Sequence, residues 1–297
     1  MSKADELVRG SIDMHFHSYP EFGLDTPCRF PLEEHARLML QAGMKGVVLK
    51  SHFWPTTERV LSLRQVVPEL EVFASITLNS SVGGIKKWAL EAAVKQGARV
   101  VWMPTWSAKS DILRNGVTPM VRRYFPSFEE YTQDDAITII DEQGVLSVDA
   151  TEILSLINAY DIALFTGHIS PLESLALARE AKRIGFKKLV FGHPDGRSVG
   201  ASSEQIVEMA DLGAYVEICA LGIMPLFMRT TPRDLKRTIE TVGARRCILS
   251  TDSFFEWLPS SPEMLRLLIA SLLEVGVREE EIREMAQLNP KRLLNLE

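Results

Sequence analysis

The stretch Ile12-Asp13-Met14-His15-Phe16-His17 decides how this chain folds, because a short, mostly apolar run ends here in a pair of histidines. Four other short apolar runs end in the same manner, three in a histidine and one in an aspartate: 47–52, 163–168, 189–193 and 247–252. Val/Ile/Leu/Phe runs of this length are typical of strands in a parallel sheet that is covered on both faces. Histidines and a carboxylate gathered at one end of such strands are ligands for zinc and similar ions. The pattern therefore predicts a metal-dependent enzyme.

Working outward from this stretch, strand-like runs alternate with helix-like segments along the chain. We expect strands at 11–15, 46–50, 71–77, 98–103, 162–166, 188–192, 214–219 and 247–251. Eight βα units predict a closed (β/α)8 TIM barrel with right-handed crossovers, and residues 1–297 suffice for one such domain. A doubly wound open sheet is the alternative, but it would not obviously bring the first and last strands together.

Capping residues support this division into helices. The expected starts are Ser170-Pro171-Leu172-Glu173, Thr231-Pro232 and Ser261-Pro262-Glu263, the expected stops are Gly185 and Gly243, and Asp149 with Glu152 is expected to cap the helix before the fifth strand. These signals agree with one another and with the βα repeat.

The segment from about 105 to 149 is too long for one βα loop. Two β-prone runs around Asp141-Glu142-Gln143-Gly144 predict a hairpin. Because it follows the fourth strand, this insertion is expected over the C-terminal mouth of the barrel, where active sites are built, as a lid or an oligomer contact.

The composition of the chain limits the classes of binding partner that we expect. The net charge of −6 gives no reason to expect a nucleic acid, which requires a basic surface. The three cysteines, Cys28, Cys219 and Cys247, form no CxxC pair and suit a reducing compartment. No leader peptide or bilayer-length apolar stretch is visible, so we expect a cytoplasmic protein with a small-molecule substrate and no membrane partner. A homo-oligomer remains an open alternative.

The histidine pair is informative only in combination. His15 and His17 are two apart on a strand, so both side chains point into the barrel mouth. Surface imidazoles at a strand end would explain that pair equally well. However, His168, His193 and Asp252 take matching positions on the fifth, sixth and eighth strands. Polar residues placed independently of one another would rarely occur at the same end of so many strands.

At this point the sequence resembles the amidohydrolase superfamily of metal-dependent hydrolases. The matching segments are Asp13-Met14-His15-Phe16-His17, Thr166-Gly167-His168, Gly192-His193-Pro194, Ser250-Thr251-Asp252 and the closing Asn289-Pro290-Lys291-Arg292-Leu293-Leu294. The resemblance implies that His15, His17, His168 and Asp252 hold the metal. It makes His193 either a further ligand or an acid/base group.

One departure from this pattern concerns a second metal. Two-metal members usually carry a bridging lysine or glutamate, most often on strand four, but here strand four ends without a ligand. The only strand-end lysine is Lys50 on strand two, interpreted as a carbamate-bearing ligand, a cation for an anionic substrate, or the partner of a carboxylate. Zinc is the first expected metal, with manganese, nickel or iron as alternatives, as one ion or two.

The substrate pocket is expected to include His52, Trp54, Lys109 and Arg197, which lie in or near loops at the mouth. Glu217 on strand seven is interpreted as a pocket residue or the partner of a cation. Asp195 is expected only to shape a turn, and His35 to lie on a helix surface.

The leading hypothesis for function is hydrolysis of an amide, ester, lactone or related bond by a metal-activated hydroxide. Asp252 would move the proton and His193 would stabilise the oxyanion. One alternative, also implied by the resemblance, is non-oxidative decarboxylation of an aromatic or unsaturated acid. An alternative of another class is a non-catalytic barrel that binds a metal or a metabolite.

Overall fold

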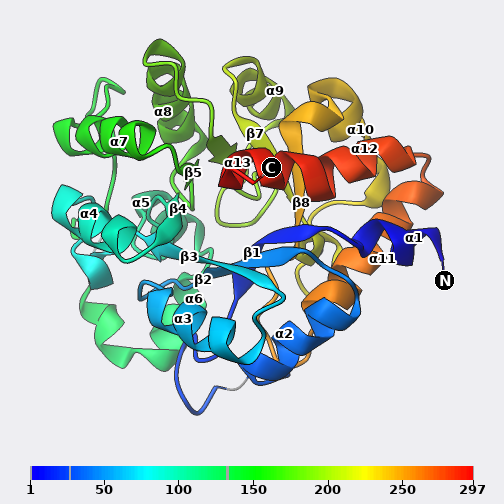
Figure 1. The fold of residues 1–297 in the computed structure, drawn as a ribbon. Coiled ribbons are helices and arrows are strands. Elements are labelled where there is room, and N and C mark those ends of the chain that lie inside the picture. The colour runs from blue at the N-terminus through cyan, green and yellow to red at the C-terminus, as the bar shows by residue number, and fades with distance from the viewer. Residues whose placement is uncertain (1, 27, 132–133, 297) are drawn as a thin grey trace.

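The predicted barrel is present in the computed structural model, which describes residues 2–26, 28–131 and 134–296 (Figure 1). Eight parallel strands follow one another in chain order, at the positions expected from the sequence. They are β1 (Ile12–His17), β2 (Gly46–Lys50), β3 (Glu71–Thr77), β4 (Ala98–Trp102), β5 (Ala163–Phe165), β6 (Leu189–Phe191), β7 (Tyr215–Cys219) and β8 (Cys247–Ser250).

Contacts between β1 and the end of β8 close the barrel. The amide of His17 donates to the carbonyl of Ser253 at 3.1 Å, and the amide of Asp252 donates to the carbonyl of His15 at 2.8 Å. On the outer side, the buried carboxylate of Asp13 accepts from the amide of Thr251 at 3.0 Å and from the hydroxyl of Ser261 at 2.8 Å. These bonds bring the first and last metal-ligand candidates together, which an open sheet would not do.

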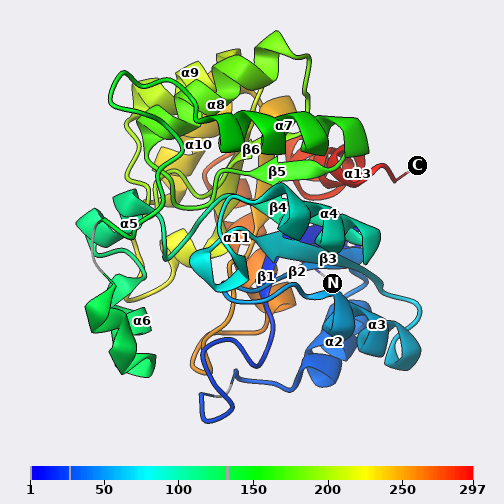
Figure 2. The same cartoon turned by 90° about the vertical axis from the view of Figure 1, so that its left-hand side faces the viewer.

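Helices alternate with the strands and surround the barrel (Figures 1 and 2). They are α1 (Lys3–Val8), α2 (Leu32–Gln41), α3 (Thr57–Val66), α4 (Lys87–Lys95), α5 (Lys109–Arg114), α6 (Thr118–Tyr124), α7 (Val148–Tyr160), α8 (Pro171–Arg183), α9 (Ser203–Asp211), α10 (Pro232–Val242), α11 (Ser261–Glu274), α12 (Glu279–Arg283) and α13 (Asn289–Leu294). The helices α8, α10 and α11 begin at the predicted positions. None of the helices in the described residues is both long and apolar enough to cross a bilayer.

Two expectations about local structure are wrong. The helix α7 is capped by Ser147, whose hydroxyl accepts from the amide of Ala150, and Asp149 instead pairs with Lys86 at 2.8 Å. His35 is buried rather than on the surface. Its ring packs against α11 and accepts a hydrogen bond from the amide of Ser261 at 2.8 Å. Burial lowers the pKa of His35 to about 4, so this imidazole is neutral.

The core has an inner and an outer layer. Ile12, Met14 and Trp102 belong to the cluster inside the barrel, where the α13 residues Leu293 and Leu294 also pack. Figure 2 shows α13 at one end of the barrel and α5 with α6 at the opposite end. The α13 side chains therefore fill the amino-terminal end of the barrel and leave the other end for a site.

The insertion at 105–149 lies at that open end and contains several short helices. It contains α5, α6 and a short 3-10 helix (Pro126–Glu130), packed in a separate cluster with Phe22 and Phe53. Where the hairpin was predicted, the structure has one isolated antiparallel bridge, between Ile140 and Leu146. The amide of Asp141 donates to the carbonyl of Val145 at 2.9 Å, which makes this a tight turn rather than a pair of extended strands.

Candidate metal centre

Three predicted ligands meet at the carboxyl ends of β1 and β8. Nε2 of His15 lies 3.0 Å from Oδ1 of Asp252, and Nε2 of His17 lies 3.3 Å from the same oxygen. The two Nε2 atoms are 3.3 Å apart. A β1 register shift between Asp13 and Phe16 allows the side chains of Met14, His15 and His17 to face the interior while Phe16 packs on the outer layer. These donor atoms point at one another rather than at solvent.

Each of three buried histidines has a carboxylate near its Nδ1 atom, and for His15 and His168 this contact is a hydrogen bond. Glu217 Oε1 lies 3.1 Å from Nδ1 of His15, and Glu21 Oε1 lies 3.2 Å from Nδ1 of His17. Asp111 hydrogen-bonds Nδ1 of His168. A carboxylate at Nδ1 fixes the tautomer and the ring orientation, so that Nε2 is presented as a lone-pair donor. Such carboxylate–histidine pairs are the usual outer support of metal-binding imidazoles.

Glu217 also connects the centre to β6. Its second oxygen accepts from the amide of His193 at 3.0 Å, while the first faces His15. Burial would raise the pKa of Glu217, but His15 and His193 outweigh this effect and leave the pKa lowered. The carboxylate therefore remains charged and fixes two histidine-bearing strands relative to each other.

The charges of the central pair are mutually dependent. Burial alone would lower the pKa of His15, yet Asp252 and Glu217 outweigh it and leave the pKa raised. Burial alone would raise the pKa of Asp252, but His15 and His17 hold it well below its usual range. A carboxylate that stays ionised in a buried cluster of imidazoles suits a cation.

His168 and His193 lie beside this group. Their ring centroids are 5.0 Å apart, and the His193 ring is 5.6 Å from that of His15. Burial and the neighbouring His168 lower the pKa of His193 to about 3, so its imidazole is neutral. The backbone is left-handed at His193, with φ of 24°, and at Asp252, with φ of 53°. Non-glycine residues rarely adopt this conformation, and those that do are often found at functional sites.

Lys50 reaches into the same cluster from β2. Its Nζ lies 2.9 Å from Nε2 of His15 and 4.2 Å from the centroid of a ring of Trp102, and its side chain is buried. Burial lowers the pKa of Lys50, although Asp252 and Glu217 oppose that shift. A neutral amine is a ligand, whereas an ammonium would compete with a metal for His15 and Asp252.

The residues present fit a divalent cation. One group whose ligand atoms all lie within 4.8 Å of one another comprises His15, His193 and Asp252, and a second comprises His17, Glu21 and His52. In addition, Nδ1 of His17 and Oε2 of Glu21 are buried without a hydrogen-bond partner among the described residues. A site rich in imidazole and carboxylate is typical of zinc, manganese, nickel or iron.

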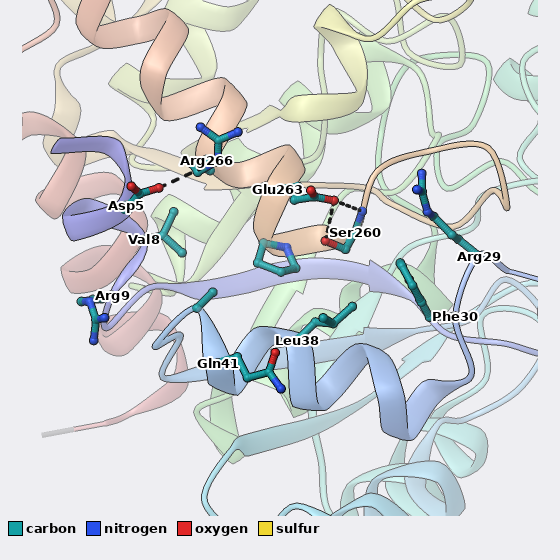
Figure 3. A pocket seen from close by; sticks show the side chains of 12 residues that line it. Asp5, Val8, Arg9, Arg29, Phe30, Leu38, Gln41, Ser260, Glu263 and Arg266 are labelled. Carbon is teal, nitrogen blue, oxygen red and sulfur yellow. Dashed lines mark hydrogen bonds and ion pairs between the residues drawn. The ribbon is translucent and has the colours of Figure 1, made fainter. Parts of the chain in front are cut away.

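A cavity of about 180 Å³ opens beside the centre. His52 and Arg197, two of the residues expected in the substrate pocket, line it together with Lys50, His168, His193 and Asp252. Trp54 and Lys109 do not line it, and their exposed side chains lie elsewhere, so we leave both out of the proposed substrate site. A larger cavity of about 510 Å³ lies outside the barrel between α1, α2 and α11 (Figure 3). The described residues that line this larger cavity include none of the candidate metal ligands, so it is not the metal centre.

Sequence reasoning missed several groups at this site. Asp111 and Glu21 lie outside the strands, in the insertion and in the loop after β1, and no local pattern marks either as a histidine partner. Asp195 lines the cavity, where burial raises its pKa to about 6, although its Pro-Asp-Gly context indicated only a turn. Arg229 also lines the cavity and follows β7 with no distinguishing motif.

Asp111→Asn tests the carboxylate that supports His168. Oδ1 of Asp111 accepts from the amide of Val117 at 2.8 Å, and the asparagine oxygen can keep that bond. The amide NH2 would then face Nδ1 of His168 and drive the ring proton onto Nε2. We expect metal affinity to fall by about 10- to 100-fold, measured by competition with a chelating dye. Asp149→Asn, at an exposed ion pair, is the control, and equal affinities in both variants would contradict the assignment.

Gly167→Ala tests the turn that presents His168. Gly167 has a φ of 58°, and a Cβ there would lie 2.2 Å from the carbonyl oxygen of Met103. Strain and collision together are expected to cost about 2–5 kcal/mol of unfolding free energy, measured by urea denaturation. The control is Gly185→Ala, where φ is 76° but no atom lies within 4 Å of the added Cβ. An equal loss of unfolding free energy in both variants would show that the added Cβ at position 167 causes no collision, and would contradict the prediction.

Solved structures of several barrel enzymes resemble this chain. An amidohydrolase from Pseudomonas aeruginosa matches with a TM-score of 0.67 and 13% identity, over 99% of this chain and 98% of that chain. The probable dipeptidase PvdM from Pseudomonas aeruginosa matches at 0.66 and 12%, over 98% and 96%. The 2,6-dihydroxybenzoate decarboxylase from Rhizobium matches at 0.62 and 10%, over 97% and 99%. The predicted likeness to amidohydrolases is therefore confirmed at the level of the fold.

Sequence comparison gives a narrower assignment. No curated protein matches the chain. One family model covers residues 10–217, which include β1 through β6 and most of β7, and therefore every proposed metal ligand except Asp252. The chain belongs to DUF6282, a family of unknown function.

Proposed function

We propose that this protein is a metal-dependent hydrolase that cleaves an amide, ester, lactone or related bond of a small molecule. The observation that carries the proposal is the set of three buried histidines, each with a carboxylate at Nδ1, gathered near Asp252. A non-catalytic role is disfavoured, because burying so many ionisable groups costs stability unless they perform a task.

The residues of the cluster have separate roles in this proposal. His15, His17 and His168 would hold the cation through Nε2, with Asp252 as a carboxylate ligand and Lys50 as a further amine or carbamate ligand. A bound divalent cation supplies Lewis-acid chemistry, lowering the pKa of water and polarising a carbonyl group. Asp252 would accept a proton from the attacking water and deliver it to the leaving group. His193, neutral and at the cavity wall, would donate a hydrogen bond to the developing oxyanion.

A second candidate is non-oxidative decarboxylation of an aromatic acid by the same centre. The specific observation in its favour is the aromatic part of the cavity wall, where Phe227 and Phe254 line the cavity together with His193 and Asp252. In that case proton transfer to a ring carbon, rather than hydrolysis, would be the task of Asp252.

Metal content and turnover test both candidates. The purified full chain would be analysed by inductively coupled plasma mass spectrometry, stripped with a chelator and reloaded separately with zinc, manganese, nickel and iron(II). Each sample would then be assayed with N-acyl amino acids, esters, lactones and aromatic acids. We expect about one or two equivalents of metal and a turnover that is lost and regained with it. Release of carbon dioxide would select the decarboxylase, and a protein that neither binds metal nor gains activity from it would refute both.

A further inference from the structure

Two arginines at the rim of the cavity have no task in the chemistry proposed above. Arg197 lies in the loop after β6 and Arg229 in the loop after β7, and both line the cavity. Both side chains are exposed, and neither guanidinium forms an ion pair within residues 2–26, 28–131 and 134–296. By contrast, exposed arginines such as Arg179 and Arg278 pair with glutamates on the helical surface. The rim therefore offers two unneutralised, planar cations.

The wall next to these arginines is apolar. Val117, Met120, Phe227 and Phe254 line the cavity together with Leu226. Phe227 stacks on Phe255 and Trp257, with ring centroids 5.3 and 5.6 Å apart and near-parallel planes. Phe254 in turn packs against His17, with centroids 4.9 Å apart. A stacked aromatic wall thus extends from the rim to the metal-ligand candidates.

The acidic and basic side chains that line the cavity lie in different parts of it. Asp252 and Asp195 line the cavity, and Oδ1 of Asp252 lies 3.0 Å from Nε2 of His15 among the metal-ligand candidates. The exposed guanidinium groups of Arg197 and Arg229 at the rim attract a free carboxylate. Lys50, deeper in the cavity, already contacts Nε2 of His15 at 2.9 Å.

We propose that the substrate is a small carboxylate with an aromatic or bulky apolar portion. Its carboxylate is held at the rim by Arg197 and Arg229, its apolar portion packs on Phe227 and Phe254, and its reactive bond points toward Asp252. Guanidinium groups recognise carboxylates through paired, charge-assisted hydrogen bonds, which suits them to this task. The inference rests on the proposed function in assuming that this cavity is the substrate site.

Binding of matched acids and amides tests the inference without requiring turnover. The probes are N-benzoylglycine with N-benzoylglycinamide, and phenylacetate with phenylacetamide, titrated calorimetrically into the full chain with metal content measured on the same samples. We expect each acid to bind the wild type about ten-fold more tightly than its amide. Arg197→Gln and Arg229→Gln should each weaken acid binding about three- to ten-fold and leave amide binding unchanged. The double variant should lose the preference for the acid, and lysine at either position should retain part of it.

Arg233→Gln is the matched control, because Arg233 is an exposed arginine on α10 that does not line the cavity. It should bind all four probes like the wild type. Equal binding of acid and amide, survival of the acid preference in the double variant, or no binding of any probe would overturn the inference. An arginine-dependent preference in a protein without metal would sustain it while the proposed function fails. Metal-dependent turnover without that preference would support the proposed function and overturn this inference.

Discussion

Asp252→Asn is expected to lower turnover by about two to four orders of magnitude, the usual scale of general acid–base catalysis. Asparagine has nearly the same shape as aspartate and retains an oxygen near Nε2 of His15, now 3.0 Å from Oδ1 of Asp252. It cannot accept and return a proton as a carboxylate does. The measurement is kcat on the substrate found by screening, with metal content determined on the same preparation.

Two comparisons make the result interpretable. Asp211→Asn, an exposed carboxylate at the end of α9, should have wild-type turnover. If Asp252→Asn also keeps its metal and turns over like the wild type, Asp252 is not the proton carrier and the proposed mechanism is wrong. If it loses the metal along with the activity, Asp252 acts as an essential ligand rather than as a base.

Alanine at His15, His17 or His168 is expected to lower metal affinity by at least about 100-fold while the barrel remains folded. Each side chain supplies one nitrogen donor to a cation whose remaining ligands hold it less well. Removing His15 has a second consequence, because Glu217 and Asp252 then face each other without the imidazole that separates their charges. Affinity would be measured by chelator competition, and folding by circular dichroism and urea denaturation.

His35→Ala is the matched control for these three variants. His35 is also a buried histidine, but its ring supports the start of α11 and has no place in the centre. We expect it to lower the free energy of unfolding and to leave metal affinity unchanged. Undiminished metal binding in all three site variants would reject the centre, and an equal loss in His35→Ala would indicate general destabilisation instead.

The sequence predicted the barrel and the meeting of its histidines because both follow from local patterns. Buried parallel strands are continuous apolar runs, and a residue directly after such a run lies at the carboxyl end of the strand. For this reason the positions of His15, His17, His193 and Asp252 at the barrel mouth follow from the sequence alone. In a closed barrel all the strand ends face one opening, so their approach needs no further information.

The partners of these histidines could not be predicted in the same way. Asp111 reaches His168 from a short helix 57 residues away in sequence, and its contact depends on the path of the insertion. Glu21 lies in a loop whose conformation is set by tertiary contacts, including the bond of 2.7 Å from the amide of His52 to its Oε1. Trp54 and Lys109 show the converse error, since proximity to the mouth in sequence did not bring their side chains to the cavity.

The position of Asp111 on α5 has a consequence for anyone who would re-engineer this protein. Loops above a barrel are commonly treated as exchangeable parts that tune selectivity while the chemistry below stays constant. Here the helix α5, which lies at the mouth of the barrel, also positions the ring of His168 through Asp111. Oδ1 of Asp111 in addition accepts hydrogen bonds from Val117 and Thr118 at the start of α6. Grafting a foreign loop between β4 and α7 would therefore alter the centre itself, and a transplant that kept every histidine would still need its own carboxylate at this point.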